Sequence, residues 1–365
     1  MKICFVAPAN NYHTQKWAGW FASHNHEVHV ISFINAKIPN VQVHYINTGA
    51  EVNASYFKKL NYLKHGKEIR NLLKEIKPDI INAHYATSYG TAMAVSKVHP
   101  YIVSVWGSDV YEFPQKNILN KIMVEYCLKK ADYIFSTSKA MALEASKYTD
   151  KKFYITPFGV DIDLFNHNKR IRQNDSKFII GTVKALNPKY GIDTLLKAAS
   201  LVYQEHPEYN LEIRIAGKGN DADNLKKLAD NLGINHIVKW LGFISQEDAA
   251  TEWANMDIGI TSSSSSSESF GVSAVECEAC ETPIIISDVP GLKEATNPGI
   301  SSLVVPRKDA RALANAIEKL HDNPQLRETM GKNGRAYVKN HYEINACFRN
   351  VESIYSKLMT KKVGQ

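Results

Sequence analysis

Short apolar runs alternate with longer amphipathic segments along almost the whole chain. An apolar run of about five residues predicts a buried strand, whereas apolar positions that recur every three or four residues predict a helix. Strands that alternate with helices are typical of parallel sheets covered by helices on both faces. In the first half, the predicted strands are Lys2–Ala7, Glu27–Phe33, Val41–Ile46, Asp79–His84, Tyr101–Val105, Tyr133–Thr137 and Phe153–Thr156. In the second half they are Lys177–Val183, Leu211–Ala216, Ile237–Leu241, Asp257–Thr261, Pro283–Ser287 and Ser302–Val305.

Two such series in one chain of 365 residues predict two α/β domains of the Rossmann-like type. A Pro/Gly segment from Pro157 to Phe165 is followed by a polar stretch over residues 166–176, which is typical of a linker. We therefore predict an N-terminal domain of residues 1–160 and a C-terminal domain of residues 161–344. Residues 345–365 predict a final helix.

The net charge of +7 is concentrated in the first half of the chain, where residues 1–165 hold 19 Lys+Arg against 13 Asp+Glu. Much of this excess lies in residues 56–77, which predict a basic amphipathic helix. Two interpretations are open: a helix packed on its domain with a solvated basic face, or a patch that meets an anionic membrane surface or a phosphate-bearing lipid. Nucleic acid is not expected as a partner, because no recognition motif accompanies the charge.

Every apolar run is shorter than a membrane span, and the N-terminal residues predict a first strand, not a signal peptide. A cytoplasmic protein is therefore expected, with a peripheral place on the inner face of the cell membrane if the basic segment meets lipid. Cys277 and Cys280 form a lone Cys-x-x-Cys pair without further candidate ligands. We interpret them as small apolar residues of a buried helix, and no metal site is predicted.

The segment that indicates chemistry most strongly runs from Ile258 to Glu276. It contains a strand, a serine-rich loop and the start of a helix near Phe270-Gly-Val272. We interpret the serine-rich loop as a mobile active-site loop. Unpaired backbone N–H groups and the dipole make such a helix start an anion site, and a glycine there lets a phosphate approach closely. Glu268 and Glu276 bracket that site, so that one carboxylate can address a sugar and the other a ribose. This arrangement is what binding a sugar nucleotide requires.

This Glu-x7-Glu arrangement, followed by the strand and turn of Pro283–Gly291, resembles the signature of retaining glycosyltransferases of the GT-B fold in the GT4-like family, the glycosyl transferases of group 1. The resemblance covers nearly the whole chain. Pro157-Phe-Gly-Val-Asp161 is similar to the Pro-Asn-Gly-Val-Asp segment at the interdomain crossing of that family, with Phe158 in place of the Asn. The resemblance implies two Rossmann-like domains that face each other across a cleft, with the final helix crossing back to the first domain.

The resemblance also implies roles for individual residues in the C-terminal domain. Glu268 would contact the transferred sugar and Glu276 the ribose hydroxyls. Aligned on Pro188 and Gly191, Lys184 takes the place of the family's diphosphate-binding Arg, Tyr190 takes that of the Lys, and Lys189 lies one position away. Such cations would stabilise the leaving diphosphate. The other predicted donor-binding residues are Gly217, Ser269, Phe270, Gly271 and Val272.

In the N-terminal domain, Ser104-Val-Trp-Gly-Ser-Asp109 ends a strand where the family commonly has Thr-Val-His-Gly-x-Asp. Trp106 occupies the His position, which leaves Asp109 as the polar group at the strand end. His84 ends the preceding strand and is a second candidate to line the same cleft. We assign Asp109 and His84 to the catalytic set, with a structural histidine as the other interpretation of His84.

The function implied is a retaining, metal-independent glycosyltransferase that needs no cofactor besides its nucleotide-sugar co-substrate. UDP is the expected nucleotide. The expected acceptor is a glycan, in particular a polyprenyl-diphosphate-linked intermediate of a bacterial capsule or a similar surface polysaccharide. Two alternatives remain: a nucleotide-sugar 2-epimerase, against which the Glu-x7-Glu context argues, and a non-catalytic protein that binds sugar nucleotides, which Trp106 and Tyr190 keep open.

Overall fold

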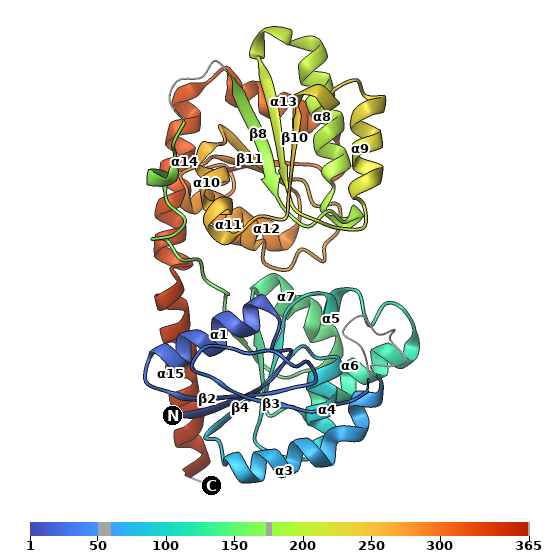
Figure 1. Ribbon diagram of the computed structural model, residues 1–365, viewed down its shortest axis with the longest axis vertical. Coiled ribbons are helices and arrows are strands. Elements are labelled where there is room, and N and C mark those ends of the chain that lie inside the picture. The colour runs from blue at the N-terminus through green and yellow to red at the C-terminus, as the bar shows by residue number, and fades with distance from the viewer. Residues whose placement is uncertain (50–59, 173–176, 364–365) are drawn as a thin grey trace. The chain divides into compact units, whose positions relative to one another are not determined.

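The computed structural model describes residues 1–49, 60–172 and 177–363 of the chain. The chain divides into two compact units: unit 1 comprises Met1–Phe158 with Phe348–Gln365, and unit 2 comprises Gly159–Cys347. The sequence predicts boundaries after residues 160 and 344, and the structure has them after Phe158 and Cys347. Each unit is an α/β domain built around one parallel sheet (Figure 1).

The sheet of unit 1 has seven parallel strands in the order β3-β2-β1-β4-β5-β6-β7. Its strands are β1 (Lys2–Val6), β2 (Glu27–Ser32), β3 (Gln42–Tyr45), β4 (Ile80–His84), β5 (Ile102–Val105), β6 (Tyr133–Ser136) and β7 (Phe153–Ile155). Its helices are α1 (Tyr12–Ser23), α3 (Gly66–Ile76), α4 (Ser88–Ser96), α5 (Ser108–Tyr111), α6 (Ile118–Lys130) and α7 (Lys139–Ala145), and most of α15 (Ile344–Val363) joins them.

The sheet of unit 2 has six parallel strands in the order β10-β9-β8-β11-β12-β13. Its strands are β8 (Phe178–Val183), β9 (Leu211–Ala216), β10 (Val238–Gly242), β11 (Ile258–Thr261), β12 (Ile284–Ser287) and β13 (Ser302–Val305). Its helices are α8 (Ile192–Glu205), α9 (Ala222–Asn231), α10 (Gln246–Asn255), α11 (Val272–Ala279), α12 (Pro290–Ala295), α13 (Ala310–His321) and α14 (Pro324–His341).

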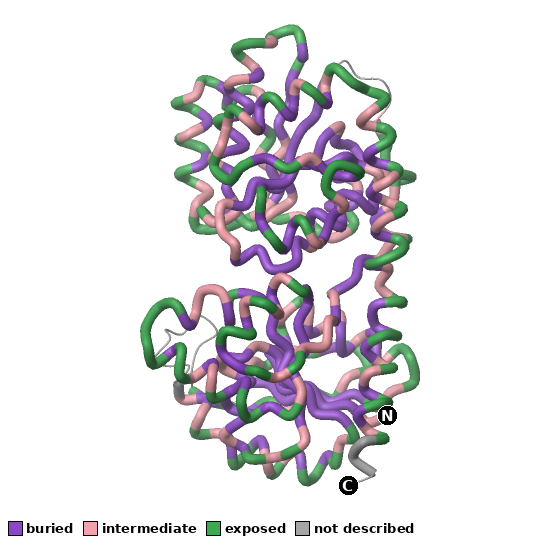
Figure 2. Tube along the Cα trace, turned by 180° about the vertical axis from the view of Figure 1, so that it is seen from behind, coloured by how far each residue is buried: buried purple, intermediate pink, exposed green. Residues whose placement is uncertain are grey.

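All the strands predicted from the apolar runs are present, with ends that differ by about a residue. Their burial explains why the runs are apolar without a polar alternation: helices cover both faces of each sheet, so both sets of side chains leave water (Figure 2). β4, β11 and β12 are buried at every position.

The final helix confirms the prediction that the chain returns to its first domain. From Phe348 onward α15 packs within unit 1 (Figure 1). The ring of Phe348 lies 5.5 Å from Trp17, and the hydroxyl of Tyr355 accepts a hydrogen bond of 2.8 Å from Asn82 Nδ2 on β4. His26 Nε2 and Glu352 Oε1 lie 2.9 Å apart at the edge of this contact.

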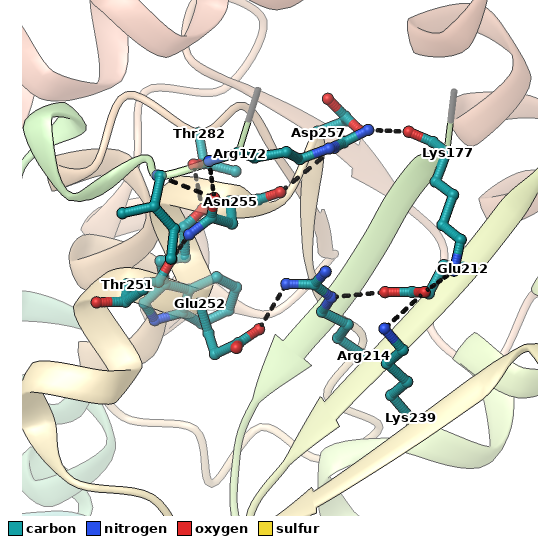
Figure 3. A network of polar contacts seen from close by, with 12 residues as sticks. Arg172, Lys177, Glu212, Arg214, Lys239, Thr251, Glu252, Asn255, Asp257 and Thr282 are labelled. Carbon is teal, nitrogen blue, oxygen red and sulfur yellow. Dashed lines mark hydrogen bonds and ion pairs between the residues drawn. The ribbon is translucent and has the colours of Figure 1, made fainter. Parts of the chain in front are cut away.

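The polar segment after the first domain is fastened to unit 2 over its described part. Arg172 donates from Nη1 to Asp257 Oδ2 at 2.6 Å, and Asn255 Oδ1 accepts from the backbone N–H of Arg172 at 3.0 Å (Figure 3). Residues 173–176 of the predicted linker lie outside the described residues. The described residues 166–172 therefore belong structurally to unit 2, where the sequence predicts a linker.

The polar contacts drawn in Figure 3 continue to a buried carboxylate, that of Glu212. Glu212 on β9 lies 2.6 Å from Lys177 Nζ, 2.8 Å from Arg214 Nε and 2.9 Å from Lys239 Nζ (Figure 3). Burial acts to raise the pKa of Glu212, but the hydrogen bonds from Lys177, Lys239 and Arg214 outweigh it and lower that pKa to about 2. The carboxylate therefore stays ionised in the folded protein.

The basic segment 56–77 differs from the continuous helix that the sequence predicts. Residues 56–59 lie outside the described residues, Leu60–His65 form a 3₁₀ turn, and α3 begins only at Gly66. The apolar side chains of α3, among them Ile69 and Leu73, are buried in the core of unit 1, which leaves charged and polar groups outside. Over its described part, the segment therefore matches the packed interpretation. None of the helices within the described ranges has the length and apolar content that a bilayer crossing requires.

Candidate functional site

The strand order of unit 2 brings two predicted loops to one point. In an open parallel sheet, ligands bind outside the carboxyl ends of the strands where the strand order reverses. In unit 2 that point lies between β8 and β11, which are neighbours in the sheet. Lys184 directly follows β8, and the serine run that leads to Glu268 directly follows β11. Residues separated by some 80 positions in sequence thus meet at one edge of the sheet.

Lys184 and Glu268 form an ion pair at this edge. Lys184 Nζ lies 2.7 Å from Glu268 Oε2, and the two side chains are only 13% and 9% exposed. The same ammonium group donates to Ser273 Oγ at 3.3 Å and lies 4.5 Å from the ring centroid of Tyr190. Lys184 is a largely desolvated cation whose partner is a carboxylate. A ligand anion can replace that carboxylate as the partner of the ammonium group.

The serine run after β11 is hydrogen-bonded to residues of the segments on either side of it. From the sequence alone, such a run would also be compatible with a flexible linker. Ser262 Oγ donates to Gly191 O at 2.7 Å, and Ser264 N donates to Lys189 O at 2.9 Å. Ser263 Oγ donates to Glu268 Oε2 at 3.3 Å. On the other side, Arg307 donates to Ser266 Oγ at 2.8 Å. These hydrogen bonds position Glu268 opposite Lys184.

The helix that follows begins at Val272, two residues later than the sequence predicts. Gly271 is its N-cap residue with φ +75°, so Phe270 lies ahead of the helix, and its buried side chain contacts Tyr342 at 5.1 Å. A Cβ at Gly271 would lie 2.6 Å from Leu292 Cδ2. The positive φ and this packing give the glycine a structural reason, and the predicted approach of a phosphate to Gly271 stays a prediction. The first turn, with Val272 and Ser273, still presents N–H groups without helical partners.

Other predicted donor-binding residues lie on the same loops and on helix α11. Glu276 lies on α11 and is 7% exposed, and Ser269 precedes the helix and is 8% exposed. Lys189 belongs to the loop after β8, and its Nζ lies 5.1 Å from the ring centroid of Tyr190, the same ring that Lys184 approaches. The ring of Tyr190 thus lies against both lysines.

Cys277 on α11 and Cys280, which caps the C-terminal end of that helix, are buried free thiols, which agrees with their interpretation as apolar residues. Within residues 1–49, 60–172 and 177–363, no cluster of three or more His, Cys, Asp and Glu side chains has the arrangement of a metal site.

Two glycines from neighbouring loops lie directly against the backbone of the ion pair. A Cβ at Gly217, where φ is +146°, would lie 1.9 Å from the carbonyl oxygen of Lys184. A Cβ at Gly291 would lie 2.2 Å from the carbonyl oxygen of Glu268. No real side chain tolerates such distances, so either substitution must displace the loop that carries a charged partner. Gly217 therefore acts on the site through Lys184, in addition to the predicted role near the nucleotide.

We expect Gly217→Ala to lower the stability of the protein by about 1–3 kcal/mol, because the added methyl group forces the Lys184 loop to move. The same displacement weakens ligand binding at the site. Gly233→Ala is the matched control: Gly233 also has a positive φ, +72°, but a Cβ there meets nothing within 4 Å. Denaturant unfolding of both variants measures the difference. Equal losses for the two variants would show that the contact with Lys184 is unimportant.

In unit 1, the carboxylate of Asp109 accepts hydrogen bonds from the backbone of two loops. Its Oδ2 accepts from Ala86 N at 2.8 Å, and its Oδ1 accepts from Gly107 N at 2.8 Å and from Trp106 N at 3.2 Å. The carboxylate is 2% exposed, and burial raises its pKa although these N–H donors act in the opposite direction. Both oxygens are thus engaged by the backbone, which is the geometry of a positioning residue. The predicted catalytic role of Asp109 stays a prediction.

His84 lies in the core of unit 1, beneath Trp106. It is fully buried, its ring centroid lies 4.1 Å from that of Trp106, and its Nδ1 lies 3.2 Å from Thr14 Oγ1. Burial, with a smaller contribution from His13, lowers the pKa of His84 well below its ordinary value, so the imidazole is neutral. Full burial and a neutral ring are compatible with the interpretation as a structural histidine. The predicted catalytic role of His84 stays a prediction.

Sequence reasoning missed Ser263 and Ser273 of the unit 2 site, and it missed the contact that Gly291 makes there. A serine within a run of serines carries no individual signal, and Ser273 is one of several polar residues on α11. Gly291 had a signal, because the turn at Pro290-Gly291 was part of the resemblance, but the partner of a glycine contact is a backbone atom that no pattern reveals.

The comparisons with known proteins agree with this geometry. The family model described as "Glycosyl transferases group 1" matches residues 165–337, and the model described as "Glycosyl transferase 4-like" matches residues 2–138. The two matches fall in the two units and together cover most of the chain.

Relatives over the full length give the same result. The chain is 23% identical over 366 residues to the capsular polysaccharide biosynthesis glycosyltransferase CapM of Staphylococcus aureus, covering 92% of this chain and 94% of CapM. Among solved structures, sucrose-phosphate synthase from Thermosynechococcus elongatus superposes with a TM-score of 0.85 at 19% identity, covering 99% of this chain and 100% of that chain. Anabaena HepE in complex with UDP and glucose gives a TM-score of 0.79 at 16% identity, with 98% and 99% covered. The chain therefore belongs to the GT4-like family, the glycosyl transferases of group 1, and has the GT-B fold.

Proposed function

We propose that this glycosyltransferase moves a sugar from a nucleotide-sugar donor, UDP-linked in the first instance, to a glycan acceptor with retention of the anomeric configuration. The observation that carries the proposal is the Lys184–Glu268 ion pair of 2.7 Å beside the first turn of α11, at the point in unit 2 where the strand order reverses. A buried cation and helix N–H groups at such a place suit a diphosphate.

In the proposed reaction the bond between the sugar's anomeric carbon and the diphosphate oxygen breaks while the acceptor oxygen bonds to the same face of that carbon. The leaving phosphate oxygen takes the acceptor proton. Negative charge grows on the diphosphate, and Lys184 with the N–H groups of Val272 and Ser273 would stabilise it. Because Lys184 then binds the diphosphate, Glu268 becomes available to the sugar hydroxyls. With this charge supplied by the protein, we propose that no metal ion takes part.

The donor and acceptor classes rest on the relatives. The structural neighbour HepE was solved with UDP and glucose, which supports UDP as the nucleotide, and Glu276 would accept hydrogen bonds from its ribose. CapM is named for capsular polysaccharide biosynthesis, which supports a glycan acceptor of a bacterial surface polysaccharide, and we propose a polyprenyl-diphosphate-linked one.

The test is the thermal stability of the protein against a panel of UDP-, GDP-, ADP- and dTDP-sugars, followed by release of nucleoside diphosphate. A ligand at about 100 times its Kd stabilises the folded state by about 2.7 kcal/mol, which a melting curve resolves. We expect one UDP-sugar to raise the melting temperature and to release UDP slowly, faster when a polyprenyl-diphosphate-linked glycan is present. The anomeric proton coupling of the product, measured by NMR, then reports retention.

Other outcomes separate the alternatives. Conversion of a UDP-sugar to its epimer without any acceptor would show a 2-epimerase. A melting shift without release of nucleoside diphosphate under any acceptor condition would show a non-catalytic binding protein. No shift with any nucleotide sugar would contradict the proposal, because the site would then not bind a diphosphate.

A further inference from the structure

Unit 2 contains a second hollow beside the serine run, in addition to the site around Lys184 and Glu268. Its volume is about 660 Å³, and it is lined by residues drawn from 188–197, 264–266 and 307–308, together with Asp221. Small-molecule sites typically measure roughly 300–1,000 Å³. We call it the α8–β13 hollow, because the N-terminal part of α8 and the segment after β13 form two of its walls.

The net charge of the α8–β13 hollow is opposite in sign to that of its domain. Unit 2 holds 21 Lys+Arg against 25 Asp+Glu, a net charge of −4. The charged residues that line the hollow are Lys189, Lys197, Arg307, Lys308, Asp193 and Asp221. Four cations against two carboxylates give the lining a net charge of +2. A positive concave surface within a negative domain indicates an anionic ligand.

The two carboxylates of the lining do not neutralise the segment after β13. Asp193 lies 2.8 Å from Lys197 on the same helix, and Asp221 accepts a hydrogen bond of 3.0 Å from the side chain of Asn224. Arg307 donates to two neutral acceptors, Asp288 O at 2.6 Å and Ser266 Oγ at 2.8 Å. Lys308 is exposed and forms no ion pair within the described part of the chain. Positive charge is therefore left for a ligand at this wall of the hollow.

The remaining polar groups of the lining suit phosphate oxygens. Ser264, Ser265 and Ser266 contribute hydroxyl groups, which can donate to an anion. A guanidinium group with a neighbouring lysine is a strong donor set for phosphate. The cations come from two separate segments, the region of α8 and the segment after β13. Two groups of cations across one hollow suit a ligand with two phosphate groups.

We propose that the α8–β13 hollow binds a small molecule that carries two phosphate groups, as a second ligand site of unit 2. One phosphate accepts from Arg307 and Lys308 and from the serine hydroxyls, and the other accepts from Lys189 and Lys197. This inference goes beyond the transferase reaction proposed above and does not depend on which sugar nucleotide is the donor.

The lining of the hollow differs from the residues assigned to the donor. Lys184, Glu268 and Glu276 lie outside the lining, whereas Lys189 belongs to both sets. The helices involved also differ. α8 packs against α9 and α13, whereas α11, which carries Glu276, packs against α10, α12 and α14 (Figure 1). A ligand in the hollow therefore lies beside the donor, and both can bind at once.

The experiment is isothermal titration calorimetry of the full chain with inorganic pyrophosphate, at constant ionic strength and without divalent cations. UDP is added to saturation beforehand, so that it occupies the donor site and pyrophosphate reports the hollow. We expect pyrophosphate still to bind. Lys197→Gln with Lys308→Gly lowers its affinity by at least about tenfold, because two charge-assisted contacts are lost. Glycine suits residue 308, where φ is +59°, so backbone strain does not explain the loss.

A matched control carries the same two changes outside the hollow. Lys97→Gly alters a lysine that also has φ +59°, and Lys226→Gln alters a lysine of α9; both side chains are exposed. We expect this variant to bind pyrophosphate as the unmodified protein does. Both double variants should bind UDP with unaltered affinity, because neither changes a residue assigned to the donor. Melting temperatures, measured in parallel, should stay within a few degrees.

A hexose bisphosphate distinguishes two sources of the same chemistry. Tighter binding than that of pyrophosphate indicates an organic bisphosphate, whose hydroxyl groups can donate to Asp193 and Asp221. Weaker binding indicates an inorganic diphosphate.

Three results would overturn the inference: no binding of either phosphate compound, displacement of pyrophosphate by UDP, or equal affinities in the hollow variant and the control. Displacement would show that the hollow is part of the donor site. A different result, in which UDP does not bind but pyrophosphate still distinguishes the hollow variant from the control, contradicts the proposed transferase function and supports the hollow. The two failures are thus distinguishable.

Discussion

Replacing Lys184 by alanine is expected to lower kcat/KM for nucleoside diphosphate release by about 10²–10³-fold. The substitution removes the buried cation that would meet the leaving diphosphate, where negative charge grows as the glycosidic bond breaks. It also leaves Glu268 buried without its partner at 2.7 Å. An unpaired buried carboxylate repels the incoming diphosphate, so donor binding and the chemical step both suffer.

A conservative variant distinguishes charge from simple loss of structure. Lys184→Arg keeps the positive charge and introduces the residue that the family commonly has at this position, so it should retain activity within about tenfold. Lys189→Ala is the second comparison, because Lys189 lies on the same loop as Lys184 and against the same Tyr190 ring. Melting curves of all three variants show whether each is folded. Unchanged kcat/KM in Lys184→Ala would refute the site assignment, even if the family assignment holds.

Glu278→Gln is expected to stabilise the protein at alkaline pH, which is an unusual result for a substitution at a fully buried position. Glu278 lies on α11 with 0% exposure, and its Oε1 accepts from Ser301 Oγ at 2.6 Å. Its Oε2 has no hydrogen-bond partner within the described part of the chain. Burial raises the pKa of Glu278 from 4.5 to about 8, and the hydrogen bond from Ser301 offsets only part of that rise. Glutamine has nearly the same shape and is neutral at every pH.

The direction of the pH effect follows from linkage. In the unfolded chain Glu278 ionises near its ordinary pKa, whereas in the folded protein it stays protonated until about pH 8. Its neutral form therefore contributes stability that is fully present below pH 4.5 and is lost as the pH rises through about 8. The total loss is on the order of 5 kcal/mol, or about 10–20 °C in melting temperature for a unit of this size.

Thermal unfolding of the unmodified protein and of Glu278→Gln from about pH 5 to about pH 9 measures this loss of stability. The curves should agree at the acidic end and diverge as the pH rises, with the variant more stable. Glu247→Gln, the same change at an exposed position of α10, is the control and should leave the pH dependence unaltered. Parallel curves for the unmodified protein and Glu278→Gln would contradict the buried, protonated state.

The elements of the fold were predictable because each strand and helix is encoded locally. Strands that lie inside each sheet are buried on both faces, so the mainly apolar runs from Ile80 to His84 and from Ile284 to Ser287 stand out against polar loops. The prediction for segment 56–77 was less accurate, because its apolar positions fit both a 3₁₀ helix and an α-helix. The start of α11 was two residues off, since Gly271 adopts a left-handed conformation that the sequence allows but does not require.

The candidate site was predictable in its residue types and only partly in its contacts. Glu268, Glu276 and Lys184 were identified through the resemblance and their places after strands. The structure added the direct pairing of Lys184 with Glu268, the serine hydrogen bonds that hold Glu268, and the burial of His84 under Trp106. These depend on the strand order of each sheet, and spacing along the chain does not encode strand order.

The sequence by itself determined the α/β class, the two domains, the family and the chemistry-bearing loop after β11, because apolar periodicity and short motifs are properties of consecutive residues. Only the tertiary structure decided which groups meet. It set the glycines Gly217 and Gly291 against the backbone of the ion pair and made Glu278 a buried acid. The physical reason is that burial and contact arise between segments distant in sequence, and an apolar residue carries the same signal in the sequence whichever segment covers it.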